Sequence, residues 1–495
     1  MSSVGVRCIA VVGVVMMSWT FATARSVDSL ALARLSDALV ELQNSELLRN
    51  GTLAFSLKST QNGRTLLGMN QDQSLPSAST LKLVSTSTVL SVLGGDYRYK
   101  TYLEHDGELR GDTLYGNLYL RGTGDPSLGS DRFDGYPSTS ELLSRWASVV
   151  QRQGIRYMKG RVVADPTYFD DGTLADTWVW GDLGNYYGAG VQGLNLNENL
   201  YRISFRAGRD VGDPTEVVKM EPDLSYLRFT NHVTTGEAGS GDQVYIYASP
   251  LGNEVILTGT VPRGVTSFTV RGAIPNPAFA AAYLLTKALT AGGVGVSGDN
   301  AMLTASVGQT SSRKELDEYS SPLLKELTQQ TNWWSINLYA DAFLKSAGKR
   351  LGAKSDFDEA IEEVTRYWRG KGADMRGFYI KDGSGLSPTG SLTAQNLTSV
   401  LNAATRDKTY PDFYNSIAVL GQTGTVRNIG RRTRAAGNVR AKSGSIEGTR
   451  AYAGYVTTKA GERLSFAIIA HKYLPDNSRT MGQELARLLV MLGDL

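Results

Sequence analysis

The chain has 495 residues, of which 41% are apolar and 20% charged, and its formal net charge is +3. The composition is that of a globular protein, and the length predicts two or three domains because one ordinary core does not grow so large. The nearly balanced charge argues against a nucleic-acid-binding protein. Cys8 is the only cysteine, so disulfides, thiolate metal sites and a cysteine nucleophile are excluded once the first residues are removed.

Residues 1–24 have the pattern of a secretory signal peptide. Arg7 supplies a positive charge, an apolar run extends from Cys8 to Met17, and Ala22-Thr23-Ala24 forms a small-x-small cleavage site. We therefore expect a mature chain that begins near Arg25 and is exported, into the periplasm or otherwise outside the cytoplasm. The alternative is an uncleaved anchor, but the apolar run is short for a membrane span, and no later segment is apolar enough for one.

Residues 25–104 are expected to form the first part of a mixed domain. Leu53, Phe55 and Leu57 alternate with polar or small residues, which predicts a strand with these three side chains on one face. The other elements expected there are a helix capped by Asp28, a hairpin turning at Asn62-Gly63, and a helix over residues 80–93.

Residues 105–310 differ from the flanking residues in their hydrophobic pattern, and we expect them to form an inserted, mainly β region of two subdomains. Short alternating stretches are separated by turns rich in glycine and aspartate. These stretches are residues 113–120, 161–164, 201–206, 243–248 and 255–260.

Residues 311–495 are expected to complete the interrupted domain. Helical patterns dominate residues 320–370, and residues 451–457 and 464–471 alternate like two neighbouring strands before a final amphipathic helix. The predicted fold class is therefore mixed α/β (α+β), with one helix-and-sheet domain split by a β insertion.

The string Ser79-Thr80-Leu81-Lys82 places a serine and a lysine three residues apart at the start of a predicted helix. At this spacing both side chains lie on one face of a helix, within hydrogen-bond reach. A serine hydroxyl needs a base to become a nucleophile, and a lysine serves as that base when burial or nearby positive charge lowers its pKa. This pair is therefore a candidate nucleophile and base.

The same pattern occurs at Ser311-Ser312-Arg313-Lys314 and at Ser346-Ala347-Gly348-Lys349. We favour Ser79 because apolar residues surround it and Pro76 precedes the helix. The other two strings lie in charged stretches, which favours an interpretation as solvent-exposed surface pairs.

Two further strings follow in the order found in serine acyl-transferases with a lysine base. In Ser335-Ile336-Asn337 the serine is suited to pass a proton and the asparagine to hold Lys82 and a substrate amide. The alternative is a polar turn beside buried tryptophans. In Lys442-Ser443-Gly444 the lysine and the hydroxyl are suited to bind a carboxylate. The alternative is an exposed lysine at the end of a strand.

The last string also suggests how a substrate would be held. Gly444 would let the substrate backbone lie close to the strand, and the backbone amides of Ser445 and Ser79 could form an oxyanion hole. The chain has 3 histidines, and none accompanies a Gly-x-Ser-x-Gly elbow, so a serine nucleophile with a histidine base is disfavoured. No His-Glu-x-x-His motif is present, so a histidine metal site is disfavoured too. No metal ion or organic cofactor is implied.

Taken together, the strings resemble the class C low-molecular-mass penicillin-binding proteins, which are exported D-alanyl-D-alanine carboxypeptidases and endopeptidases. The similarity extends to residues 116–128, 159–165, 381–387 and 424–427. The long separation between Lys82 and Ser335 fits this family, because compact β-lactamases have no room for such an insertion. The resemblance implies a penicillin-binding transpeptidase-like domain with a central antiparallel sheet flanked by helices.

The resemblance also implies a role for each residue of the three strings. Ser79 would form the acyl-enzyme, Lys82 would be the base, Ser335 would relay protons, Asn337 would position Lys82 and substrate, and Lys442 with Ser443 would hold the terminal carboxylate. The strings depart from the family pattern at Ile336, where aspartate is frequent, and at Ser443, where threonine is usual. Neither change removes a reacting atom.

We therefore expect a periplasmic serine DD-peptidase that acts on peptidoglycan stem peptides and is acylated by β-lactams. Neither a nucleic-acid partner nor a membrane span after signal cleavage is expected. The balance between carboxypeptidase and endopeptidase action is left open. The alternatives are a β-lactamase or esterase on the same fold, and a non-catalytic cell-wall-binding protein.

Overall fold

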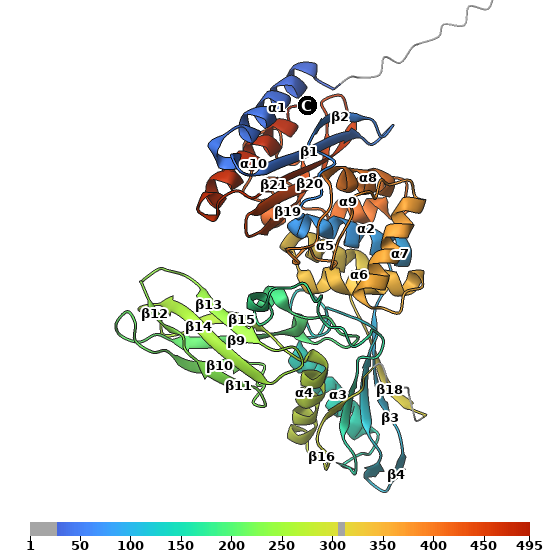
Figure 1. Cartoon of the computed structure of the whole chain (residues 1–495). Coiled ribbons are helices and arrows are strands. Elements are labelled where there is room, and N and C mark those ends of the chain that lie inside the picture. The colour runs from blue at the N-terminus through green and yellow to red at the C-terminus, as the bar shows by residue number, and fades with distance from the viewer. Residues whose placement is uncertain (1–26, 305–311) are drawn as a thin grey trace, which may run out of the picture.

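The computed structural model describes residues 27–304 and 312–495, and the predicted signal peptide lies outside this part of the chain. In Figure 1 the two ends of the chain (blue, orange and red) build one domain, while the residues between them (teal to yellow) build the other half of the molecule. Among the described residues, no helix combines the length and the apolar character that a membrane span requires.

The first domain is centred on an antiparallel sheet in the order β19-β20-β21-β1-β2. Its strands are β1 (Thr52–Ser59), β2 (Thr65–Met69), β19 (Arg440–Ile446), β20 (Thr449–Thr457) and β21 (Arg463–His471). The first strand lies beside the last one, since β1 pairs with β21 from Thr52↔His471 to Ser59↔Leu464. This pairing closes the two ends of the chain into one sheet.

Helices cover both faces of this sheet (Figure 1). α1 (Ser29–Gln43) and α10 (Ser478–Leu492) lie on one face, where Leu53, Phe55 and Leu57 of β1 pack with them. α8 (Ala394–Ala404) lies on the other face, where Ser56 of β1 hydrogen-bonds to Thr398 at 2.9 Å. The predicted alternation of β1 and the predicted sheet flanked by helices are thus confirmed.

A helical layer on the α8 side contains α2, and the candidate nucleophile lies just before its N-terminal end. Its other members are α5 (Leu324–Trp334), α6 (Asn337–Leu351), α7 (Phe357–Gly370) and α9 (Tyr410–Ser416). α2 (Lys82–Leu93) is buried from Lys82 to Leu90. Its hydroxyl side chains tolerate burial because they donate to carbonyls of the preceding turn, as Thr88 does to Val84 at 2.6 Å. A helix buried all round keeps Lys82 away from water.

The inserted residues form two lobes, seen side by side in the lower half of Figure 1. One lobe contains α3 (Thr139–Arg152), α4 (Pro277–Ala291) and two sheets, in the orders β17-β8-β6-β3-β18 and β16-β7-β5-β4. Its strands are β3 (Lys100–His105), β4 (Glu108–Arg110), β5 (Thr113–Tyr115), β6 (Leu118–Gly122), β7 (Tyr157–Met158), β8 (Val162–Asp165), β16 (Gly295–Val296), β17 (Ala301–Met302) and β18 (Lys314–Ser320).

The other lobe contains one sheet in the order β10-β9-β15 and another in which β14 pairs with β11, β12 and β13. Its strands are β9 (Leu200–Arg206), β10 (Glu216–Glu221), β11 (Arg228–Asn231), β12 (Thr234–Gly236), β13 (Gln243–Ala248), β14 (Glu254–Pro262) and β15 (Phe268–Ala273). Both lobes share a continuous apolar core, to which Leu120 of β6 and Phe205 of β9 belong.

The division of the chain at residues 105 and 310 stays a prediction. β3 and β18 pair with each other from Lys100↔Ser320 to His105↔Lys314, so we propose that the inserted region runs from about Lys100 to about Ser320. α3 is absent from the predicted elements, although Ser138 and Glu141 form a capping box in front of its apolar face.

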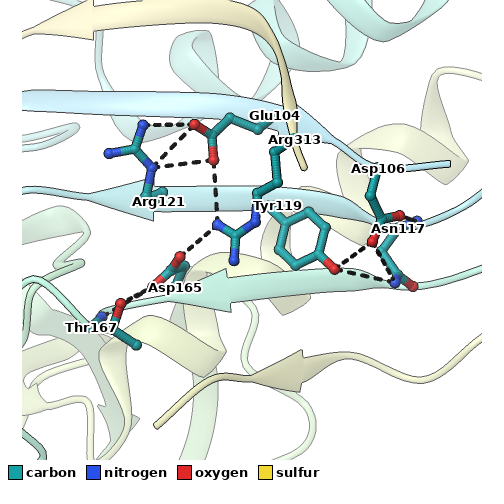
Figure 2. Close-up of polar contacts among 8 residues, drawn as sticks. All are labelled: Glu104, Asp106, Asn117, Tyr119, Arg121, Asp165, Thr167 and Arg313. Atoms are coloured by element: carbon teal, nitrogen blue, oxygen red, sulfur yellow. Dashed lines mark hydrogen bonds and ion pairs between the residues drawn. The ribbon is translucent and has the colours of Figure 1, made fainter. Parts of the chain in front are cut away.

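A buried cluster of charges ties the chain returning from the insertion to β3, β6 and β8 (Figure 2). Arg313, whose side chain is 6% exposed, lies 2.6 Å from Asp165 and 3.3 Å from Glu104. Glu104 also accepts from Arg121 at 2.6 Å, and the Arg313 guanidinium lies 3.9 Å from the centroid of the Tyr119 ring. One arginine thus pairs with carboxylates from two strands.

Replacing Arg313 with methionine is expected to lower the free energy of unfolding by about 3 kcal/mol, because it leaves the fully buried Asp165 carboxylate without its counter-ion. Urea unfolding followed by circular dichroism measures this loss. Arg110→Met breaks an exposed pair with Glu108 and is expected to cost less than about 0.5 kcal/mol. Equal stabilities of the two variants would contradict a structural role for the cluster.

Candidate active site

Ser79 lies on a tight turn that leads into α2. Residues Ala78 to Leu81 form a single 3-10 turn, η2, and the α-helix itself begins at Lys82, slightly later than predicted. Residues i and i+3 of a 3-10 turn eclipse one another. The side chains of Ser79 and Lys82 therefore meet, with Nζ 2.9 Å from Oγ, and the predicted juxtaposition is present.

Lys82 is fully buried and its Nζ contacts three oxygen atoms. It lies 2.9 Å from Ser79 Oγ, 2.6 Å from Asn337 Oδ1 and 2.7 Å from the Ser384 carbonyl. Burial lowers the pKa of Lys82 to about 8, against the opposing effect of the Asp341 and Asp382 carboxylates. A neutral amine at this position donates its two hydrogens to Asn337 and Ser384 and directs its lone pair at the Ser79 hydroxyl.

Two buried carboxylates hold the loop that carries Ser384. Asp382 accepts from the backbone amide of Gly385 at 2.6 Å and from the Trp178 indole of the inserted region at 2.8 Å. Asp341 of α6 accepts from the Gly383 amide at 2.7 Å, and burial together with Asp382 raises the pKa of its carboxyl. Neither carboxylate was among the predicted site residues. The Asp-Gly-Ser-Gly spacing of the loop was the available signal.

Ser335 and Lys442 form a second polar pair at the site. Ser335 ends α5 in the left-handed conformation (φ 61°), and its Oγ accepts from Lys442 Nζ at 2.9 Å. Lys442 is fully buried on β19, so the alternative of an exposed strand-end lysine is wrong. Burial, together with the positive charge of Lys82, holds the pKa of Lys442 well below its usual range.

Asn337 begins α6 and connects the catalytic domain to the insertion. Its Oδ1 accepts from Lys82, as predicted, whereas its Nδ2 donates to the Tyr187 carbonyl at 2.7 Å. Tyr187 belongs to a short turn of the inserted region, η4 (Tyr186–Gly188). One of the two amide hydrogens of Asn337 thus has a protein partner in the inserted region, and the predicted contact of Asn337 with a substrate amide stays a prediction.

β19 forms the wall of the site opposite α6. Ser443 Oγ lies 2.7 Å from Thr425 Oγ1, and Ser445 is exposed beside Ser79. A Cβ at Gly444 would lie 2.9 Å from the Ser79 amide nitrogen and 2.9 Å from the Ser77 carbonyl oxygen. Gly444 is therefore required for the contact between β19 and the nucleophile turn, and its predicted role in making room for substrate stays a prediction.

The side chains and turns described so far surround a cleft of about 500 Å³. The catalytic domain and the inserted region both line it. The cleft is lined by Ser79, Val179, Asp182, Tyr186, Tyr187, Trp334, Ser335, Asn337, Gly385, Leu386, Pro388, Ser445, Ile446 and Glu447. Aromatic and apolar walls around a few converging polar groups are typical of a small-molecule or peptide site.

The other two Ser-x-x-Lys strings lie away from this cleft. Ser346 is buried in α6 and hydrogen-bonds to the Tyr99 hydroxyl at 3.0 Å, so its interpretation as part of an exposed surface pair is wrong. In the third string, Ser311 lies outside the described residues and Arg313 belongs to the charge cluster of Figure 2. Within residues 27–304 and 312–495, no three histidine, cysteine or carboxylate side chains are placed to hold a metal ion.

The sequence matches the profile of the D-Ala-D-Ala carboxypeptidase 3 (S13) family over residues 35–491. It is 29% identical over 424 residues to a D-alanyl-D-alanine carboxypeptidase of Actinomadura sp. (strain R39), covering 83% of this chain and 76% of the relative. It is 22% identical over 452 residues to the D-alanyl-D-alanine carboxypeptidase DacB of Haemophilus influenzae, covering 90% of each chain.

The fold is similar to that of penicillin binding protein 4 (dacB) from Haemophilus influenzae. The TM-score to its crystal structure is 0.78 with 21% sequence identity, over 93% of this chain and 98% of that chain. A second structure of the same protein, complexed with a β-lactam, gives a TM-score of 0.74 with 20% identity. The predicted penicillin-binding fold is confirmed.

Fold and sequence together define a serine peptidase of the penicillin-binding type. The chain belongs to the D-Ala-D-Ala carboxypeptidase 3 (S13) family. The predicted family and the predicted class of enzyme, a serine-type D-alanyl-D-alanine carboxypeptidase, are thereby confirmed.

Proposed function

We propose that this protein is an exported DD-peptidase in which Ser79 is the nucleophile and Lys82 its base, acting on the D-alanyl-D-alanine ends of peptidoglycan stem peptides. The observation that carries the proposal is the environment of Lys82, a buried amine with a pKa of about 8 that contacts the Ser79 hydroxyl. An amine of this kind can remove the hydroxyl proton near neutral pH, as a serine nucleophile requires.

Acylation begins when Ser79 Oγ attacks the carbonyl carbon of the penultimate D-alanine and Lys82 Nζ takes the hydroxyl proton. The carbonyl oxygen becomes negative and is stabilised by the backbone amides of Ser79 and Ser445, two residues that both line the cleft. Asn337 keeps Lys82 in place throughout, because its Oδ1 accepts from Nζ at 2.6 Å.

The leaving group departs on the side of the second polar pair. The Lys442 amine and the hydroxyl of Ser443 hold the terminal carboxylate of the substrate, and that carboxylate favours the protonated form of Lys442. Ser335 Oγ, which accepts from Lys442 at 2.9 Å, passes the proton taken by Lys82 to the departing amine. Water then attacks the ester, Lys82 takes a proton from that water, and the proton returns to Ser79.

The same serine would open the ring of a β-lactam and remain acylated. The leaving amine of a β-lactam stays attached to the acyl group, so it blocks the approach of water. The match to a penicillin binding protein structure solved with a β-lactam supports this proposal. If the departing amine belongs to a second, cross-linked peptide, the same reaction cleaves the cross-link, and the enzyme acts as an endopeptidase.

The test uses a peptide ending in Lys-D-Ala-D-Ala and a fluorescent penicillin. The expected result is release of D-alanine from the peptide, and one penicillin adduct per chain, located by mass spectrometry on the peptide that contains Ser79. Rapid hydrolysis of the penicillin without a trapped adduct would indicate a β-lactamase. Neither release nor labelling would indicate a non-catalytic wall-binding protein.

A further inference from the structure

A groove leads from the active-site cleft onto the inserted region. Next to the cleft lies a cavity of about 200 Å³, and the two share Tyr186, Tyr187, Trp334, Ser335 and Asn337. A further cavity of about 260 Å³ follows, sharing Arg132, Glu198, Leu200 and Arg271 with the previous one. These adjoining cavities form a groove on the inserted region next to the site that contains Ser79.

Three arginines line this groove, and they differ in how their charge is balanced. Arg132 is paired with the buried Glu198 at 2.6 Å. Arg202 lies 3.9 Å from Asp131 and is the cross-strand neighbour of Glu221 on β10. Arg271 makes no ion pair with any residue that the structure describes; its guanidinium lies over the Tyr186 ring, 4.2 Å from the centroid. Among the described residues of the groove, Arg271 is thus the arginine whose charge no carboxylate pairs with.

Arg271 and Arg202 lie opposite each other on neighbouring strands. Arg271 of β15 and Arg202 of β9 are cross-strand neighbours in the antiparallel register. Like charges in this position destabilise a sheet, and neither strand needs an arginine for packing, because both side chains are exposed. A bound anion would relieve the repulsion.

The ring of Tyr186 orients the guanidinium of Arg271. An aromatic ring that covers the face of a guanidinium leaves the N–H groups at its edge free, and this edge matches a carboxylate with two parallel hydrogen bonds. Tyr186 also lines the active-site cleft. Arg271 is therefore held at the point where the groove meets the site of reaction.

We propose that Arg271, supported by Arg202, binds a carboxylate of the peptide substrate that is remote from the reacting bond. This inference rests on the proposed function, in which Lys442 binds the terminal carboxylate, so Arg271 receives a second one. The groove then selects acidic cell-wall peptides over a bare D-alanyl-D-alanine dipeptide. The second carboxylate belongs either to the acyl part of the peptide or, in a cross-link, to the departing peptide.

The experiment measures peptide affinity without turnover, in a Ser79→Ala background, by isothermal titration calorimetry. Two peptide pairs are used, each consisting of a free carboxylate and the matching carboxamide. One pair places this group in the acyl part and the other beyond the reacting bond. In one of the pairs, the carboxylate peptide is expected to bind about tenfold more tightly than the carboxamide, because charge-assisted hydrogen bonds are lost in the amide.

Adding Arg271→Gln is expected to abolish this tenfold preference and to change the Kd of the carboxamide less than about twofold. Arg228→Gln, an exposed arginine on β11 outside the groove, is expected to leave the preference intact. The inference is overturned if neither pair shows a preference, or if the preference survives Arg271→Gln. Penicillin lacks the remote carboxylate, so labelling of the single variant Arg271→Gln by penicillin tests the proposed function independently of this inference.

Discussion

Replacing Ser79 with alanine is expected to reduce release of D-alanine from a Lys-D-Ala-D-Ala peptide by at least about 10⁴-fold, because removal of the nucleophile leaves only binding and the oxyanion hole. Labelling by fluorescent penicillin is expected to disappear as well, since Ser79 supplies the only hydroxyl that contacts the Lys82 amine among the described residues. Both quantities are measured with purified protein, by a coupled D-alanine assay and by in-gel fluorescence.

The matched control is Ser346→Ala, which alters the serine of another Ser-x-x-Lys string. Ser346 hydrogen-bonds to Tyr99 and lines no part of the cleft, so labelling and D-alanine release are expected to stay within about twofold of the wild type. Undiminished labelling of Ser79→Ala, or loss of labelling in Ser346→Ala at unchanged stability, would falsify the assignment of the nucleophile.

Replacing Lys82 with methionine is expected to slow acylation of Ser79 by about 10³-fold, within the range that a general base contributes. Methionine fills the space of the lysine stem but cannot accept a proton. In the wild type, the pKa of about 8 predicts that the rate of acylation rises with pH up to about 8 and then levels off. Below that pH it falls about tenfold per unit, because protonation of Lys82 removes the lone pair.

Stopped-flow acylation by a chromogenic β-lactam between pH 5 and 10 measures both effects. The residual rate of Lys82→Met is expected to lack the rise near pH 8, and this distinguishes a missing base from a disturbed fold. Lys349→Met, at the lysine of the Ser346 string, serves as the control with an unchanged profile. A wild-type rate independent of pH, or one that falls as pH rises to 8, would contradict a lysine base.

The arrangement of the site explains why these effects are large. Lys82 is held by Asn337 from α6 and by Ser384 from the loop that Asp382 fixes, so the amine has no freedom to turn away from Ser79. The Trp178 indole and the Tyr187 carbonyl connect the same groups to the inserted region. The insertion is thus part of the structure that positions the base.

Most of what could be predicted about the site came from residues that are close together in the sequence. Ser79 and Lys82 are three residues apart, so local backbone geometry alone brings their side chains together. The alternation of Leu53, Phe55 and Leu57 likewise indicated that these three side chains share one face of β1, although the other face is buried too. The order of the three strings and the length between them indicated the family, because these features do not depend on how distant segments pack.

Long-range packing decided the rest. Segments far apart in the chain bury Lys442 and bring the charge of Asp382 close enough to act on Lys82. They also place Arg271 opposite Arg202. The low pKa of Lys82 is likewise a tertiary property, since it depends on exclusion of water by the surrounding helices. The sequence by itself thus determined the reacting groups and the class of enzyme. The tertiary structure alone decided their protonation, the role of Gly444, and the basic groove beside the site, because burial and charge neighbourhood are set by contacts between distant residues.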